Sequence, residues 1–212
     1  MLNEQLEALY DAKFPQLVEH LEAAGTRVKG PFLLGTHRWN EKKDCFEEDE
    51  SWYTEADLKV MIIGKETNHW NLLFSDDGKL KFIDGKPLVA GDFMESYQRF
   101  YGDNYQEYGT VGEFNVSKSP FFNKGVNGIM SQLRDEILDI EYPGKRAACI
   151  WNNISKLSTA DGKAVNATTH EIEHEYFHVI PEEVNILKPD IVLFFTGFHE
   201  EYERYIHENF NL

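Results

Sequence analysis

The loop that begins at Gly64 places several groups capable of acid, base or hydrogen-bonding chemistry close together. Glu66 offers a general base, while Asn68 and His69 offer hydrogen bonds or proton transfer. Gly64 lets the backbone turn sharply and approach a ligand closely. The loop directly follows an uninterrupted apolar run, which is typical of a strand buried on both faces. Because functional groups in open α/β sheets gather beyond the carboxyl ends of such strands, we interpret this loop as a candidate site. The alternative is an ordinary polar connection that caps a helix.

Two further apolar runs also stop in polar segments. The run 147–151 ends at Asn152 and Asn153, and the run 190–195 ends at Thr196 and Gly197. Apolar strands that are separated by helical patterns predict a parallel sheet with right-handed crossovers and helices on both faces. We therefore expect a three-layer αβα fold with a short, mostly parallel central sheet. All these polar strand ends would then meet at one edge.

The remaining segments predict elements that surround this sheet. Residues 3–24 have apolar side chains at helical spacing, interrupted only by Pro15, and indicate a covering helix. Residues 80–90 contain two short apolar runs around Asp84-Gly85, which predicts a β-hairpin insertion. No internal repeat or linker divides the chain, so we expect a single domain over residues 1–212.

The strongly acidic composition limits the function classes that are open to this chain. The 212 residues have a formal net charge of -16, so binding to DNA phosphates requires a local concentration of the few cations. Candidates for such a cluster, several of them beside the expected site loops, are Lys118, Lys124, Lys145, Arg146, Lys156 and Lys163. The alternative is ordinary solubilising charge.

Hydropathy and cysteine usage indicate the compartment. No segment approaches the roughly 20 apolar residues of a membrane helix, and the N-terminus lacks a signal peptide, so we expect a cytoplasmic protein without membrane contact. Cys45 and Cys149 lie far apart in the sequence, and we expect free thiols.

The motifs taken together resemble the uracil-DNA glycosylase superfamily, in particular its divergent bacterial members. The segment 64–69, which includes Lys65, resembles the superfamily's first motif, in which the residue that activates water lies two positions after a glycine. Ser119-Pro120-Phe121-Phe122 is similar to the segment whose aromatic ring stacks on the extruded base. Trp151-Asn152-Asn153 resembles the strand end whose asparagine reads the edge of the base, and 187–197 resembles the third core strand. Order and spacing agree over residues 58–199.

The resemblance implies a specific division of labour. Phe121 or Phe122 would supply the stacking face, and Asn152 or Asn153 would pair with the imide edge of uracil. Glu66 would polarise a water for attack on the sugar carbon as the N-glycosidic bond breaks. Gly64, Lys65 and Asn68 would complete the base-binding loop. The expected partner is DNA or a nucleobase, and no cofactor or metal is expected.

The chain departs from the superfamily in one respect. We expect it to lack the C-terminal strand that carries a histidine, commonly followed by proline, because the fifteen residues after Gly197 suffice for one short helix, and no His-Pro pair occurs in the sequence. Either His69 or His199 substitutes for that histidine, or the protein is a degenerate member or has kept the fold for another task.

A competing pattern lies in residues 170–178, where His-Glu-x-x-His occurs twice. On one helix, His170, His174 and His178 would share a face, and two imidazoles could bind Zn²⁺ beside a glutamate base. The interleaved glutamates instead favour a solvated helix with an exposed histidine stripe and no intrinsic metal.

Three functions therefore remain open. The first is a DNA glycosylase-like hydrolase that cleaves the N-glycosidic bond of uracil or a related base, with Glu66 and His69 as catalytic residues. The second is a catalytically weakened protein of the same fold that binds nucleobases or nucleic acid. The third is a zinc-dependent hydrolase built on the histidine helix. The sequence predicts no oligomeric state.

Overall fold

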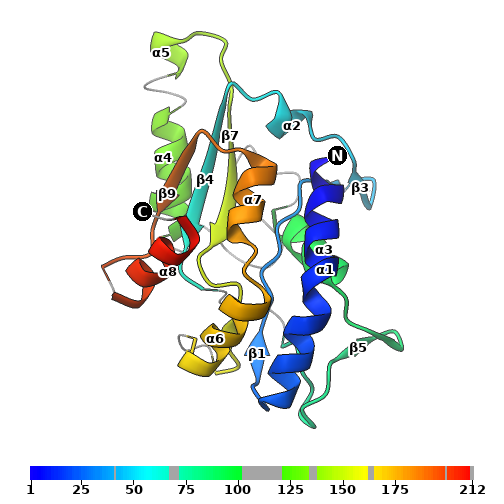
Figure 1. The fold of residues 1–212 in the computed structure, drawn as a ribbon. Helices are drawn as coiled ribbons and strands as arrows, with labels where there is room; N and C mark the ends of the chain where they lie inside the picture. The colour runs from blue at the N-terminus through cyan, green and yellow to red at the C-terminus, as the bar shows by residue number, and fades with distance from the viewer. Residues whose placement is uncertain are drawn as a thin grey trace.

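A parallel sheet with the strand order β7-β4-β9 lies at the centre of the molecule (Figure 1). The structure is a computed structural model, and it describes residues 1–40, 42–66, 72–101, 121–133, 138–161, 165–198 and 200–210. The strands are β4 (Leu58–Gly64), β7 (Ala147–Asn153) and β9 (Ile191–Phe194). These are the runs that the sequence predicts as strands, and the predicted parallel pairing is confirmed.

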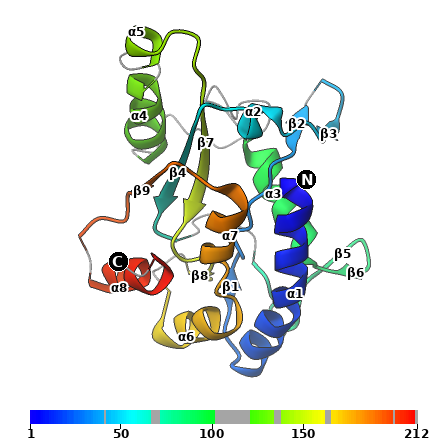
Figure 2. The ribbon, with the colours of Figure 1, turned by 45° about the horizontal axis from the view of Figure 1, so that its top comes forward.

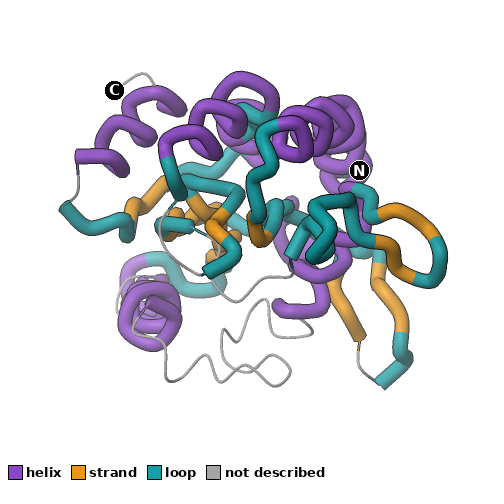
Figure 3. The backbone as a smooth tube through the Cα atoms, turned by 90° about the horizontal axis from the view of Figure 1, so that it is seen from below, coloured by secondary structure: helices purple, strands orange, loops and turns teal. Residues whose placement is uncertain are grey.

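Helices cover both faces of this sheet (Figure 3). One layer contains α1 (Leu2–Ala23), α6 (Ala167–Tyr176), α7 (Ile180–Leu187) and α8 (Glu200–Phe210). The other side has the π-helix η3 (Phe121–Asn127) and α4 (Gly128–Ser131). The shorter helices α2 (Ser51–Thr54) and α5 (Asp139–Glu141) lie at the periphery, and α3 (Ala90–Tyr101) packs against α1. This mixed α/β arrangement is compatible with the three-layer fold that the sequence predicts.

Short antiparallel pairs flank the central sheet. They are β1 (Val28–Lys29) with β8 (Ser158–Thr159), β2 (Arg38–Asn40) with β3 (Cys45–Glu47), and β5 (Phe82–Ile83) with β6 (Lys86–Pro87). The last pair confirms the predicted hairpin. Its turn residues Asp84 and Gly85 both have positive φ, 50° and 77°. Two positive φ values are the signature of the type I′ turn that Asp-Gly favours.

Helix α1 runs through Pro15 without a break, so the interruption expected there does not occur. Pro15 lies on the exposed side, whereas the side chains at helical spacing on the other side are buried: Leu6, Tyr10, Phe14, Leu17 and Leu21. They join one continuous hydrophobic cluster with the inner residues of β4 and β7. Burial of this stripe stabilises the helix against the local cost of the proline.

The described cysteines are both free, with Cys45 exposed and Cys149 buried in β7, as the sequence predicts. Burial raises the pKa of the Cys149 thiol well above its usual range. Within the described segments, no helix is both long and apolar enough to cross a membrane.

Candidate functional site

The carboxyl ends of β4 and β7 lie side by side, because Gly64 and Asn153 are register partners in the parallel ladder. The pairing continues beyond the strands: Ile154 N donates to Gly64 O at 2.9 Å, and Ser155 N donates to Lys65 O at 2.9 Å. These bonds fix the start of the Gly64 loop against the end of β7. Parallel topology therefore brings the Glu66 and Asn153 segments to one edge of the sheet, as expected.

Asn153 is the central polar residue of this edge. It is 2 % exposed, and its Oδ1 accepts a hydrogen bond from Trp151 Nε1 at 3.2 Å. Because an indole N–H can only donate, the amide oxygen must face Trp151. This leaves Nδ2 buried, with no acceptor among the described residues. A buried donor without a partner costs about 1–3 kcal/mol, so it requires an explanation.

Gly64 packs directly against that amide. A Cβ at this position would lie 2.8 Å from Asn153 Oδ1 and 3.1 Å from Phe121 Cε2, both closer than normal contacts. The absence of a side chain thus lets the β4 backbone, the Asn153 amide and the Phe121 ring meet. The sequence predicts that Gly64 lets the backbone approach a ligand, and in the structure the close approach is to these two side chains.

The two neighbouring phenylalanines have different surroundings. Phe122 is 8 % exposed and its ring packs edge-on against Trp151 with centroids 4.6 Å apart, so it belongs to the core. Phe121 is half-buried, and its ring makes an edge contact with Phe195 at 6.1 Å between centroids. Of the two predicted stacking residues, Phe121 is therefore the one placed beside Asn153 and Gly64. Both begin a π-helix, an irregularity that often occurs at functional sites.

Glu66 has a partner that the sequence does not reveal. The Tyr202 hydroxyl of α8 donates a short hydrogen bond to Glu66 Oε2. Burial, followed by this contact with a carboxylate, raises the pKa of Tyr202, so the phenol stays protonated and remains a donor. Lys65 Nζ lies 5.2 Å from the centroid of the same ring. In the sequence, the helical spacing of Tyr202, Tyr205 and Asn209 indicates a buried helix face, but it does not indicate that Tyr202 contacts Glu66.

Asn152 does not lie in this site, so of the two asparagines predicted to read a base only Asn153 remains a candidate. The sequence places both asparagines in a loop, whereas β7 extends through Asn153. Successive strand side chains point to opposite faces, so Asn152 projects away from Asn153. Its Nδ2 donates to Glu183 Oε2 at 2.9 Å and its Oδ1 accepts from Lys156 Nζ at 2.5 Å. Its hydrogen bonds are thus used inside the protein.

Lys156 is likewise removed from the predicted set of phosphate-binding cations. It is fully buried, and its Nζ is 2.8 Å from Glu183 Oε2. Tyr10 OH donates to the other carboxylate oxygen of Glu183 at 2.6 Å, which completes a buried network between α1, α7 and the end of β7. Burial lowers the pKa of Lys156 despite the opposing effect of Glu183. Lys145 and Arg146 form ion pairs at the opposite end of β7, with Asp57 and Glu55.

The other predicted members of the site lie outside the described residues. These are Asn68, His69 and His199, together with the cations Lys118 and Lys163.

The histidine segment differs from the exposed stripe that the sequence predicts. Helix α6 ends at Tyr176, so His178 lies beyond it. His170 has a side chain only 12 % exposed, stacks on Tyr205 of α8 at 3.6 Å between centroids, and has its Nε2 3.3 Å from Glu208. Burial lowers the pKa of this imidazole. One side of the helix packs against α1 and α8, which half-buries His170 and His178, whereas the other side, with Glu171, His174 and Glu175, is exposed, so the predicted stripe is exposed only at His174.

Among the residues with described positions, no group of three or more His, Cys, Asp or Glu side chains is arranged to hold a metal ion. The geometry of this segment therefore gives the zinc hypothesis no support.

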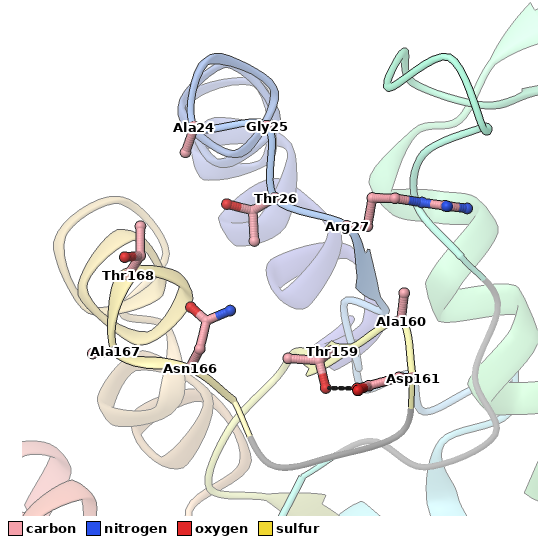
Figure 4. A pocket seen from close by; sticks show the side chains of 10 residues that line it. All are labelled: Ala24, Gly25, Thr26, Arg27, Thr159, Ala160, Asp161, Asn166, Ala167 and Thr168. Atoms are coloured by element: carbon pink, nitrogen blue, oxygen red, sulfur yellow. Dashed lines mark hydrogen bonds between the residues drawn. The ribbon is translucent and has the colours of Figure 1, made fainter.

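A separate cavity of about 680 Å³ lies between the end of α1 and the beginning of α6 (Figure 4). Of its described lining residues, only Arg27 is basic, and this side chain points away from the hollow and pairs with Asp76 at 2.6 Å. Thr159 is hydrogen-bonded to Asp161 at 2.7 Å across one wall. The cavity is wide open and contains none of the predicted site residues, so we assign the chemistry to the sheet edge instead.

Comparison of the chain with protein-family models, with curated proteins and with solved structures found no match.

Proposed function

We propose that this protein is a uracil-DNA glycosylase-like hydrolase whose base-recognition site is the edge formed by Gly64, Glu66, Phe121 and Asn153. The observation that carries the proposal is the buried Nδ2 of Asn153, which has no acceptor in the described part of the chain. Such a donor is explained if a ligand supplies the acceptor. The resemblance of the sequence motifs to that superfamily supports a nucleobase as this ligand.

The fixed orientation of the amide supports selection of an imide edge. With Oδ1 held by Trp151, Nδ2 donates to a carbonyl such as O4 of uracil, and the second lone pair of Oδ1 remains for the N3–H. Cytosine presents an amino group where uracil has O4, so two donors would face each other. The mismatch leaves a buried donor unpaired and costs about 1–3 kcal/mol, or roughly 5- to 150-fold in affinity.

Phe121 and Glu66 complete the proposed reaction. The half-buried Phe121 ring offers a face on which an extruded base stacks. Glu66 accepts the Tyr202 hydroxyl through Oε2, and the carboxylate keeps further acceptor capacity for a water. The water oxygen bonds to C1′ of the sugar as the N-glycosidic bond breaks, and its proton passes to Glu66. The base leaves with its developing negative charge on the carbonyl that faces Asn153 Nδ2.

The hypothesis of base binding without turnover has its own support. The Glu66 carboxylate is already hydrogen-bonded to Tyr202, and the net charge of -16 opposes the approach of a DNA backbone. In that case the site would bind a base and Glu66 would have no catalytic effect.

Release of uracil from single- and double-stranded oligonucleotides, detected as abasic sites, tests the proposal. We expect Glu66→Gln to reduce the rate by about 10²–10⁴-fold with little change in base binding, because the general base is removed and the shape is retained. Asn153→Asp should reduce binding itself, because an acceptor replaces the donor. Glu203→Gln on the exposed side of α8 is the matched control. Undetectable release by the wild type alongside measurable uracil affinity would favour the binding function, and equal rates for wild type and Glu66→Gln would remove Glu66 from the mechanism.

A further inference from the structure

The hairpin β5–β6 exposes large apolar side chains. Phe82 is 64 % exposed and Ile83 is 54 % exposed, although both lie in a strand. The two strands pair with each other and not with the central sheet, and the hairpin projects beside α1 (Figure 2). An isolated two-stranded hairpin is marginally stable in water, and exposed apolar groups of this size mark interaction surfaces.

An apolar groove lies beside this hairpin. It has a volume of about 620 Å³ and runs between the second half of α1 and the base of the hairpin. Its apolar walls come from Phe14, Pro15 and Val18 of α1 and from Leu80, Leu88 and Val89. Glu19 and Glu22 of α1 also line it and supply negative charge.

The hairpin and the groove are complementary in charge as well as in hydrophobicity. Residues 79–87 carry Lys79, Lys81 and Lys86 against Asp84, so this hairpin segment has a net charge of +2 in a chain whose net charge is -16. Ile83 and Lys86 are register partners, so an apolar and a basic side chain project from the same face. In the described part of the chain, none of these lysines, nor Glu19 or Glu22, forms an ion pair.

We propose that two copies of this chain associate about a two-fold axis, with the hairpin tip of each copy in the α1 groove of the other. The hairpin then enters the groove edge-on, with Ile83 on one face and Phe82 on the other contacting its apolar walls, and Lys81 and Lys86, which share the face of Ile83, approach Glu19 and Glu22. A two-fold axis forms each contact twice, so a modest surface contributes double its own binding energy. This inference is independent of the proposed hydrolase function, because the hairpin and the α8 end of the sheet lie on different sides of the molecule (Figure 1).

Sedimentation velocity of the full chain over a range of concentrations tests the dimer. We expect the wild type to dimerise and the double variant Phe82→Ser/Ile83→Ser to weaken dimerisation by at least about tenfold. Both side chains are exposed, so circular dichroism should show an unchanged fold. Ile140→Ser is the control, because Ile140 is 68 % exposed on α5, far from the hairpin. A monomeric wild type at the highest concentration reached would overturn the proposal, as would a dimer that the hairpin variant leaves intact.

Charge exchange identifies the interface more specifically. Lys81→Glu/Lys86→Glu makes hairpin and groove both negative, and Glu19→Lys/Glu22→Lys makes both positive, so each variant alone should be monomeric. In an equimolar mixture every hairpin meets a groove of opposite charge, and we expect the dimer to return. Dimerisation of either variant alone, or failure of the mixture to dimerise, would contradict this pairing.

Discussion

Glu173 couples the stability of this protein to pH. Its carboxylate is buried, accepts from Ser155 Oγ at 2.7 Å and from Lys156 N at 2.5 Å, and ties α6 to the segment that follows β7. Burial raises the pKa of Glu173 to about 7, from an ordinary value of 4.5. Between these two values the folded protein holds a proton that the unfolded chain has released. The contribution to the free energy of unfolding is therefore complete below the unfolded pKa and is lost as the pH rises through about 7.

The loss amounts to about 2–3 kcal/mol between about pH 5 and about pH 8.5. Urea unfolding of the wild type and of Glu173→Gln across this range isolates the effect, because the amide does not titrate. We expect the stability of the wild type relative to the variant to fall by that amount as the pH rises. Glu171→Gln on the exposed side of α6 should show the same pH profile as the wild type. A constant difference between wild type and Glu173→Gln would refute the reasoning.

Two further substitutions test the site and the buried network. Gly64→Ala should weaken uracil binding by at least about tenfold, because the added Cβ would lie 2.8 Å from the Asn153 amide oxygen. Gly91→Ala is the control: the nearest atom to its Cβ would be 3.9 Å away, so uracil binding should be unchanged in the same titration. Lys156→Met should lower the free energy of unfolding by about 3–5 kcal/mol, because it leaves a carboxylate buried without its cation. Lys145→Met at an exposed ion pair should cost less than about 1 kcal/mol in parallel urea unfolding, and equal losses for the two lysine variants would contradict this assignment.

The features that sequence predicts well here have local causes. The central strands are uninterrupted apolar runs, and the Asp84-Gly85 turn needs only the tolerance of these residues for positive φ. The convergence of Glu66 and Asn153 follows from parallel topology, which the alternation of strands and helical patterns already indicates.

The features that sequence does not predict depend on contacts between distant segments. The sequence does not show that β7 continues through Asn153. Pairing of Asn153 with Gly64 of β4 extends the strand to that residue, so Asn152 and Asn153 project to opposite faces and only Asn153 enters the site. The contact of Tyr202 with Glu66 joins segments 136 residues apart. Glu173 lies in a polar pattern typical of a solvated helix, yet packing of α6 against its neighbours buries it. Local pattern predicts the elements, whereas their mutual packing decides which side chains are available.

The most direct test of the central claim is nuclear magnetic resonance of the side-chain amide of Asn153 and the indole N–H of Trp151 during titration with uracil. Nδ2 is buried without an acceptor among the residues that the structure describes, and Oδ1 is held by Trp151, so uracil should shift both signals and cytosine should shift them much less at equal concentration. Assignment by Asn153→Asp and Trp151→Phe identifies the two signals. If uracil leaves both signals unchanged, alone and within a single-stranded oligonucleotide, this edge of the sheet is not a nucleobase site.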